Sequence, residues 1–328
     1  MRKILSIILC AVMLLSCVAV ASAEEAVKTG LAILVSNAGS KNATADAAGV
    51  ADSYIKIFAV TVDDNGVIDA CKIDYIQAKI NFNAAGEVTT AMGTVFASKI
   101  ELDDAYGMRK ASPIQKEWDE QANAFADYCV GKTVEELKGI AVNEAGKATG
   151  ADLTASVTIP VTEFIDGVEA AVAAAAHLGA QKGDELKLTS IAKVNKAQNA
   201  TADADGATQT YGHMAAITKK GDVITSAVID AIQANVTFNA KGEITSDIAA
   251  PVITKLNQKD DYGMRKASPI QKEWFEQSQG FCAWITGQTV AEALAVAVNE
   301  SGYPTEADVI TSCTMNINDM LVLLKKAQ

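Results

Sequence analysis

The stretch Tyr106-Gly-Met-Arg-Lys-Ala-Ser-Pro-Ile-Gln-Lys-Glu-Trp118 recurs without a change at Tyr262 to Trp274. The same spacing of 156 residues relates further pairs, among them Gly131/Gly287, Thr133/Thr289, Asn143/Asn299, Gly146/Gly302, Asp152/Asp308 and Thr158/Thr314. A repeat this long indicates two whole domains and not a stack of short solenoid units. We therefore expect two tandem homologous domains at 24–178 and 186–328, joined by a linker at 179–185. Each is long enough to form its own core.

The front half of each domain has the pattern of an antiparallel sheet. Residues 30–35, 54–62 and 67–76 are rich in β-branched side chains and are separated by turn signals. Asp64-Asn65-Gly66 is typical of a tight hairpin, because Asn-Gly accepts the positive φ values of a type I′ turn. The pattern predicts a meander of three strands.

The back half of each domain has a helical pattern. Ser112-Pro113-Ile114-Gln115 resembles a capping box that starts a helix ending at Gly131, and Thr133-Val-Glu-Glu136 starts a second one. A short β-prone run at 156–159 precedes a last helix, with Thr162 or, in the second copy, Asn318 as the expected N-cap. The predicted fold class is thus α+β, with an antiparallel sheet packed by two or three helices in each domain.

The N-terminus has the features of an export signal. Met1-Arg2-Lys3 precedes an apolar run, and Ala21-Ser22-Ala23 supplies a small-residue cleavage site, so we interpret residues 1–23 as a signal peptide. In the alternative interpretation, Leu14-Leu15-Ser16-Cys17 is a lipobox, and a lipid on Cys17 would anchor the protein. Either interpretation predicts an extracellular or cell-surface protein.

Composition argues against several classes of function. The formal net charge of −12 repels phosphate backbones and anionic headgroups, so we expect no nucleic-acid partner and no membrane contact beyond a possible lipid anchor. The sequence contains no P-loop, no G-x-S-x-G, no H-E-x-x-H and no G-x-G-x-x-G. The two histidines, His177 and His213, have no histidine counterpart in the other copy. We therefore expect neither a catalytic site nor a metal site shared by the domains.

Near their ends the copies share a more specific pattern. Asp152-Leu-Thr-Ala-Ser156-Val-Thr158 and Asp308-Val-Ile-Thr-Ser312-Cys-Thr314 each lie four residues ahead of an expected helix cap. This pattern resembles the attachment motif of FMN-binding domains that are modified by an FAD:protein FMN transferase of the ApbE type. The wider arrangement is similar to the surface flavoproteins of Gram-positive extracellular electron transfer, over about residues 104–170 and 260–326. The motif departs from the family pattern where Ser-Val and Ser-Cys replace Gly-Ala before the threonine.

The resemblance implies two covalent FMN groups, each joined through its phosphate to the hydroxyl of Thr158 or Thr314. Ser156 and Ser312 are the other hydroxyls present in both runs, and Asp152 and Asp308 begin the motifs. Such a protein carries electrons and turns over no substrate. Its donor would be a membrane quinol or an NADH-linked flavoenzyme, and its acceptor an external oxidant or a partner reductase.

Part of the repeated stretch is not explained by helix capping. Tyr106, Met108 and Arg109, with Tyr262, Met264 and Arg265, have side chains that suit an isoalloxazine ring or a phosphate. They are equally consistent with a solvated loop, or with a recent duplication. The rival to the flavoprotein is a cofactor-free binding or structural module that duplicated for avidity.

Overall fold

A computed structural model of the chain describes residues 25–328, so the predicted signal peptide and the alternative anchor at Cys17 lie outside the described residues. The strands are β1 (Lys28–Ser36), β2 (Gly49–Val62), β3 (Ile68–Phe82), β4 (Val95–Phe96), β5 (Glu185–Gln198), β6 (Gly206–Lys220) and β7 (Val223–Phe238). The α-helices before residue 180 are α1 (Lys99–Leu102), α2 (Trp118–Cys129), α3 (Val134–Lys138), α4 (Ala151–Thr154) and α5 (Thr162–Ala173). Those after it are α6 (Lys255–Gln258), α7 (Trp274–Ile285), α8 (Val290–Leu294), α9 (Ala307–Ile310) and α10 (Asn318–Lys326), and short 3₁₀ turns occur at Asp103–Tyr106, Lys259–Tyr262 and Arg265–Ala267.

The strands form two antiparallel sheets, in the orders β1-β2-β3 and β4-β5-β6-β7. The predicted meander and the α+β class are therefore confirmed. The strands are longer than the sequence predicted, because β2 begins at Gly49 and β3 continues to Phe82. One strand pairing was not expected. β4 lies within the first predicted domain, residues 24–178, but it pairs with β5 of the second sheet.

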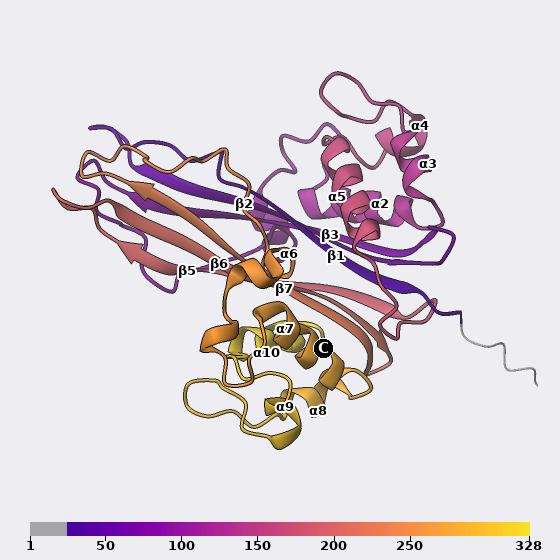
Figure 1. Cartoon of the computed structure of the whole chain (residues 1–328). Coiled ribbons are helices and arrows are strands. Elements are labelled where there is room, and N and C mark those ends of the chain that lie inside the picture. The colour runs from indigo at the N-terminus through magenta and orange to yellow at the C-terminus, as the bar shows by residue number, and fades with distance from the viewer. Residues whose placement is uncertain (1–24) are drawn as a thin grey trace, which may run out of the picture.

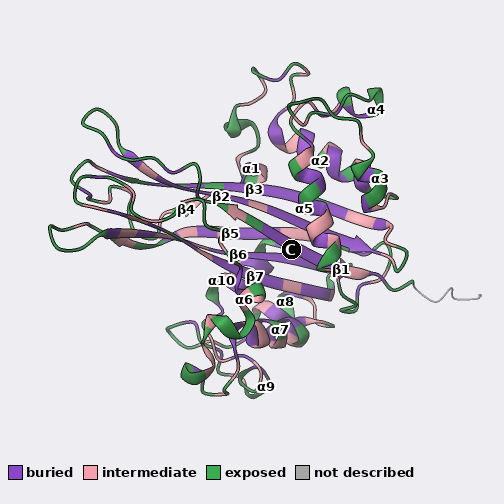
Figure 2. Cartoon of the chain, turned by 45° about the horizontal axis from the view of Figure 1, so that its top comes forward, coloured by how far each residue is buried: buried purple, intermediate pink, exposed green. Residues whose placement is uncertain are grey.

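The two sheets pack face to face, and the helices cover the two outer faces (Figure 1). A shared core of buried aliphatic side chains lies between the sheets, including Ile55 and Ile57 of β2 with Met214 and Ile232 of β6 and β7. Helices α2 and α5 contact the outer face of the first sheet, and α7 and α10 contact the second. The strands are buried on both faces along much of their length (Figure 2). The result is a four-layer arrangement with one central apolar layer.

Equivalent residues of the two halves meet each other at the end of the sandwich. The rings of Phe82 and Phe238, which are 156 positions apart, stack with centroids 4.0 Å apart and an interplanar angle of 2°. Two backbone bonds repeat this reciprocity, from Ala43 N to Gly242 O (2.8 Å) and from Ala200 N to Gly86 O (2.7 Å). The halves are thus arranged like the subunits of an isologous dimer, in which the same patch is used twice.

The long helix of each half starts later than the sequence predicted. α2 begins at Trp118, and its capping box joins Glu117 and Glu120, so the box assigned to Ser112 was wrong. The chain before it is irregular, with Gln115 at φ 51°. Ser112 Oγ instead accepts a 3.1 Å hydrogen bond from the buried Gln121 and a longer one, 3.4 Å, from the N–H of Lys116, which precedes the helix.

Two other local predictions about the back half were wrong, whereas the short capping boxes were right. Residues 156–159 form no strand, and the last helices are preceded by Val161 and Ile317, neither of which caps with a side chain. The capping boxes at Thr133 and Thr289 are both present. Thr162 is the first helical residue and not the N-cap, and Gly146, at φ 71°, lies so close to its side chain that a Cβ there would come within 2.6 Å of Oγ1.

Candidate functional site

Thr158 and Thr314 occupy the same setting in the two halves. Each is half-buried in the irregular segment between a one-turn helix and the last helix of its half. The backbone N–H of Thr158 donates to Gln121 Oε1 at 2.8 Å, and its hydroxyl donates to the same oxygen at 3.2 Å. Thr314 makes the same two bonds to Gln277, also at 2.8 and 3.2 Å. Both hydroxyls are therefore held in one orientation by a buried amide.

The two glutamines connect each threonine to the repeated stretch. Gln121 is fully buried, and its Nε2 donates to Ser112 Oγ and to Lys116 O, both at 3.1 Å. Gln277 repeats this with Ser268 at 2.9 Å and Lys272 O at 3.1 Å. A buried amide that lacks hydrogen-bond partners destabilises the folded state. Each glutamine therefore keeps its bonds to both sides and fixes its threonine relative to the repeated stretch.

Sequence reasoning missed these glutamines. They lie on helix faces that otherwise pack into the core, beside Ala122 and Phe125 in α2. The available signal was a glutamine at the same position in both copies, where an apolar side chain would have been expected.

The other residues of the two runs have mainly local roles. The hydroxyls of Ser156 and Ser312 donate to the carbonyls of Leu153 (3.2 Å) and Val309 (3.1 Å), three residues back. These hydroxyls are thus engaged with backbone, and the threonine hydroxyls with the glutamines. Asp152 accepts a 2.9 Å hydrogen bond from Tyr128 OH, which adds to burial in raising the pKa of that phenol.

The aspartates differ between the copies. Position 284, equivalent to Tyr128, is a tryptophan whose ring lies against Phe281. Trp284 has no hydroxyl group, so Asp308 lacks the phenol partner that Asp152 has. An aromatic ring is retained at the position in both halves.

The arginines of the repeated stretch are already paired. Arg109 contacts Asp104 at 2.5 Å and Glu120 at 2.7 Å, and Arg265 contacts Asp260 at 2.6 Å and Glu276 at 2.9 Å. Hydrogen bonds to these carboxylates raise the arginine pKa values further. Each guanidinium is thus paired with two carboxylates of its own half, one from the preceding 3₁₀ turn and one from the following helix.

Tyr106 and Trp118 both contact a buried lysine, Lys99. The Nζ of Lys99 lies 4.8 Å from the ring centroids of both, and it donates a 2.9 Å hydrogen bond to Tyr54 OH. Burial lowers the pKa of Lys99 to about 8, opposed by the nearby Asp74 carboxylate. Burial raises the pKa of Asp74 to about 6, although its Oδ1 accepts the N–H of Ile100 at 3.1 Å.

The second half repeats this aromatic cage around Lys255. Its Nζ lies 4.5 Å from the ring centroid of Tyr262 and 5.3 Å from that of Trp274, and it donates to Tyr211 OH at 2.8 Å. Burial lowers its pKa to about 8 as well. The available sequence signal for this cage was a lysine at the same position in both copies, Lys99 and Lys255.

The predicted site residues therefore form two groups in each half and not one. Thr158 belongs to the glutamine network, while Tyr106 faces the lysine cage, and Met108 packs against the core and donates its N–H to Glu117. Across residues 25–328, no hydrogen bond or ion pair joins Tyr106, Met108 or Arg109 to the run from Asp152 to Thr158. Met264 likewise packs against the second core and donates to Glu273.

Comparison with known proteins gives no relative: no protein-family model, no curated protein and no solved structure matches the chain. Within residues 25–328, no helix is long and apolar enough to cross a bilayer. The same residues contain no cluster of three or more histidine, cysteine or acidic side chains that could hold a metal ion.

Proposed function

We propose that the two halves are tandem copies of one FMN-binding-like domain, and that the protein is an exported electron carrier. In this proposal one FMN is joined by its phosphate to Oγ1 of Thr158 and another to Oγ1 of Thr314. The observation that carries it is the identical anchoring of both threonines by Gln121 and Gln277. The hydroxyl proton is directed at an amide oxygen, so the oxygen lone pairs are directed away from the glutamine.

The setting of Thr158 is suited to a phosphoester. α5 starts four residues later, and the first N–H groups of a helix have no partner within it and attract anions. The one carboxylate in that first turn, Glu163, is paired with Lys56 at 2.7 Å. Its repulsion of a phosphate is therefore reduced.

The setting of Thr314 is similar. The carboxylate in the first turn of α10 is Asp319, which is paired with Lys193 at 2.7 Å and lies 3.3 Å from His213 Nδ1. These contacts hold the pKa of Asp319 at about 2, despite the opposing effect of its burial. In this half, the contacts of Asp319 with Lys193 and His213 thus take the place of the ion pair between Glu163 and Lys56.

The covalent bond suits an exported carrier, because a dissociating flavin would be lost to the medium. FMN supplies the redox chemistry when it is bound, and the chain holds the phosphate end in place. The partners in this proposal are an FAD:protein FMN transferase, a membrane quinol or NADH-linked donor, and an external acceptor or reductase. The alternative is the cofactor-free binding module.

Colour and mass distinguish these functions. Protein exported from a host that contains the transferase should remain yellow after acid precipitation and should gain two units of FMN less water. The variants Thr158→Ala and Thr314→Ala should each keep one flavin, and the double variant none. A colourless parent protein would favour the binding module, and a double variant that still carries covalent flavin would refute the assignment of the threonines.

A further inference from the structure

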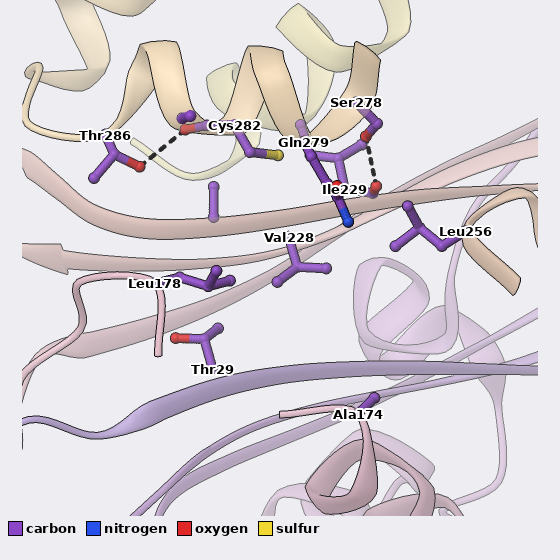
Figure 3. Close-up of a pocket in the computed structure, with 12 residues that line it drawn as sticks. Thr29, Ala174, Leu178, Val228, Ile229, Leu256, Ser278, Gln279, Cys282 and Thr286 are labelled. Carbon is purple, nitrogen blue, oxygen red and sulfur yellow. Dashed lines mark hydrogen bonds between the residues drawn. The ribbon is translucent and has the colours of Figure 1, made fainter. Parts of the chain in front are cut away.

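A groove of the described structure lies where the two halves meet, on one side of the sandwich. It has a volume of about 590 Å³ and is lined by β7 and α7 of the second half together with Thr29 of β1 and the chain after α5 (Figure 3). None of the lining side chains is charged. This volume falls in the range of small-molecule sites, which are concave and mostly apolar.

The hydroxyls that line the groove are bonded within the protein. Thr29 Oγ1 pairs with Ser226 Oγ at 2.6 Å, Ser278 donates to Ile229 O at 2.7 Å, and Thr286 donates to Cys282 O at 2.9 Å. Gln279 is different. Gln279 is an exposed residue at the mouth of the groove, its side chain extends from α7 toward β7, and no hydrogen bond within residues 25–328 engages its amide (Figure 3).

The equivalent groove on the other side of the sandwich has the opposite character. It is smaller, about 370 Å³, and it is lined by Asp69, Lys72, Asp127, Asp184, Glu185 and Lys187 among others. By the offset of 156 residues, Lys72 is equivalent to Val228 and Asp127 is equivalent to Ala283. The halves have thus diverged so that one groove is charged and the other is free of charge.

We propose that the uncharged groove binds an uncharged, largely apolar small molecule that has one hydrogen-bonding group for the amide of Gln279. A charged ligand would lose its hydration without gaining a counter-charge, whereas an apolar ligand removes the aliphatic lining from water. The site lies between the halves, so it exists only when both are folded together. This proposal does not depend on the flavin.

The test uses the parent protein and N-phenyl-1-naphthylamine, an uncharged fluorescent probe with one N–H group. The parent should bind one probe per chain in a saturable titration. Ala283→Asp installs in this groove the residue that the opposite groove already has at Asp127, so the fold should tolerate it. It should weaken binding about tenfold or more, because an unpaired carboxylate opposes apolar binding.

The matched control is Asp127→Ala, which should leave the affinity within about twofold, a change of under 1 kcal/mol. Circular dichroism establishes that each variant folds, and Val228→Lys serves as a second variant if Ala283→Asp does not. The absence of saturable binding to the parent would overturn the proposal. So would equal affinities of the parent and the folded groove variants, or an equal loss in the control.

Discussion

The substitution Gln121→Leu tests whether the buried amide holds Thr158 in place. Leucine has a similar size but cannot make the bonds that Gln121 makes to Thr158, Ser112 and Lys116. The N–H of Ile159, which also donates to Gln121 Oε1 at 3.3 Å, loses its partner as well. The change therefore leaves several polar groups unpaired in one place.

The size of the effect follows from how buried these groups are. An unpaired buried polar group costs about 1–3 kcal/mol, and Thr158 and Ile159 fall at the low end because water reaches half-buried residues. We expect the free energy of unfolding, from a urea titration, to fall by about 3 kcal/mol. Flavin loading at Thr158 should fall too, while Thr314 should load as in the parent.

Asn123→Leu is the control, since Asn123 lies exposed on α2 two residues further along. It should change the free energy of unfolding by no more than about 0.5 kcal/mol. A loss of less than about 1 kcal/mol for Gln121→Leu would refute the structural role of the network. Normal loading of Thr158 in that variant would refute its role in presenting the threonine.

Further predictions concern pH and the contact between the halves. Because the pKa of Lys99 and Lys255 falls from 10.5 to about 8 on folding, the unfolded lysines bind more protons between these values, so the two lysines contribute a rise in the free energy of unfolding with pH across that window. Burial raises the pKa of the Cys282 and Cys313 thiols, and their contribution has the opposite sign, so the lysine effect is measured as the difference between the parent and a lysine variant. Urea titrations should show that the stability of the parent relative to Lys99→Met increases with pH between about 8 and 10.5; a difference that does not change with pH would contradict the burial effect. Phe238→Ala should cost about 3–5 kcal/mol of stability, and a double-mutant cycle with Phe82→Ala should give a coupling of about 1 kcal/mol. Strict additivity would mean that the ring stack adds nothing beyond burial.

The sequence was sufficient to predict the parts of the fold that depend on local patterns. Segments rich in β-branched residues and separated by turn signals predicted the meander, and Thr133 with Glu136 predicted a capping box that the structure contains. The start of α2 was predicted wrongly because Ser112 and Pro113 match a helix start locally. The Ser112 hydroxyl instead accepts a hydrogen bond from Gln121, which lies inside α2, three residues after the helix begins at Trp118.

The arrangement of the halves could not be predicted from a local pattern. The sheets pack face to face because each has apolar side chains on both faces, but the sequence does not say which partner covers the second face. The sites were partly predictable in the same sense. The repeat offset predicted that Thr158 and Thr314 are equivalent, and the structure gives them the same hydrogen bonds. The separation of Tyr106 from Thr158 was not predictable, because Tyr106 faces Lys99, whose burial only the tertiary structure shows.

Peptide mapping of flavinylated protein tests the central claim most directly. Protein exported in the presence of the transferase is digested, and the fluorescent peptides are sequenced by mass spectrometry. We predict FMN less water on Thr158 in one peptide and on Thr314 in another, both in most molecules. Flavin on Ser156 and Ser312, or peptides with unmodified threonines and no flavin elsewhere, would contradict the account.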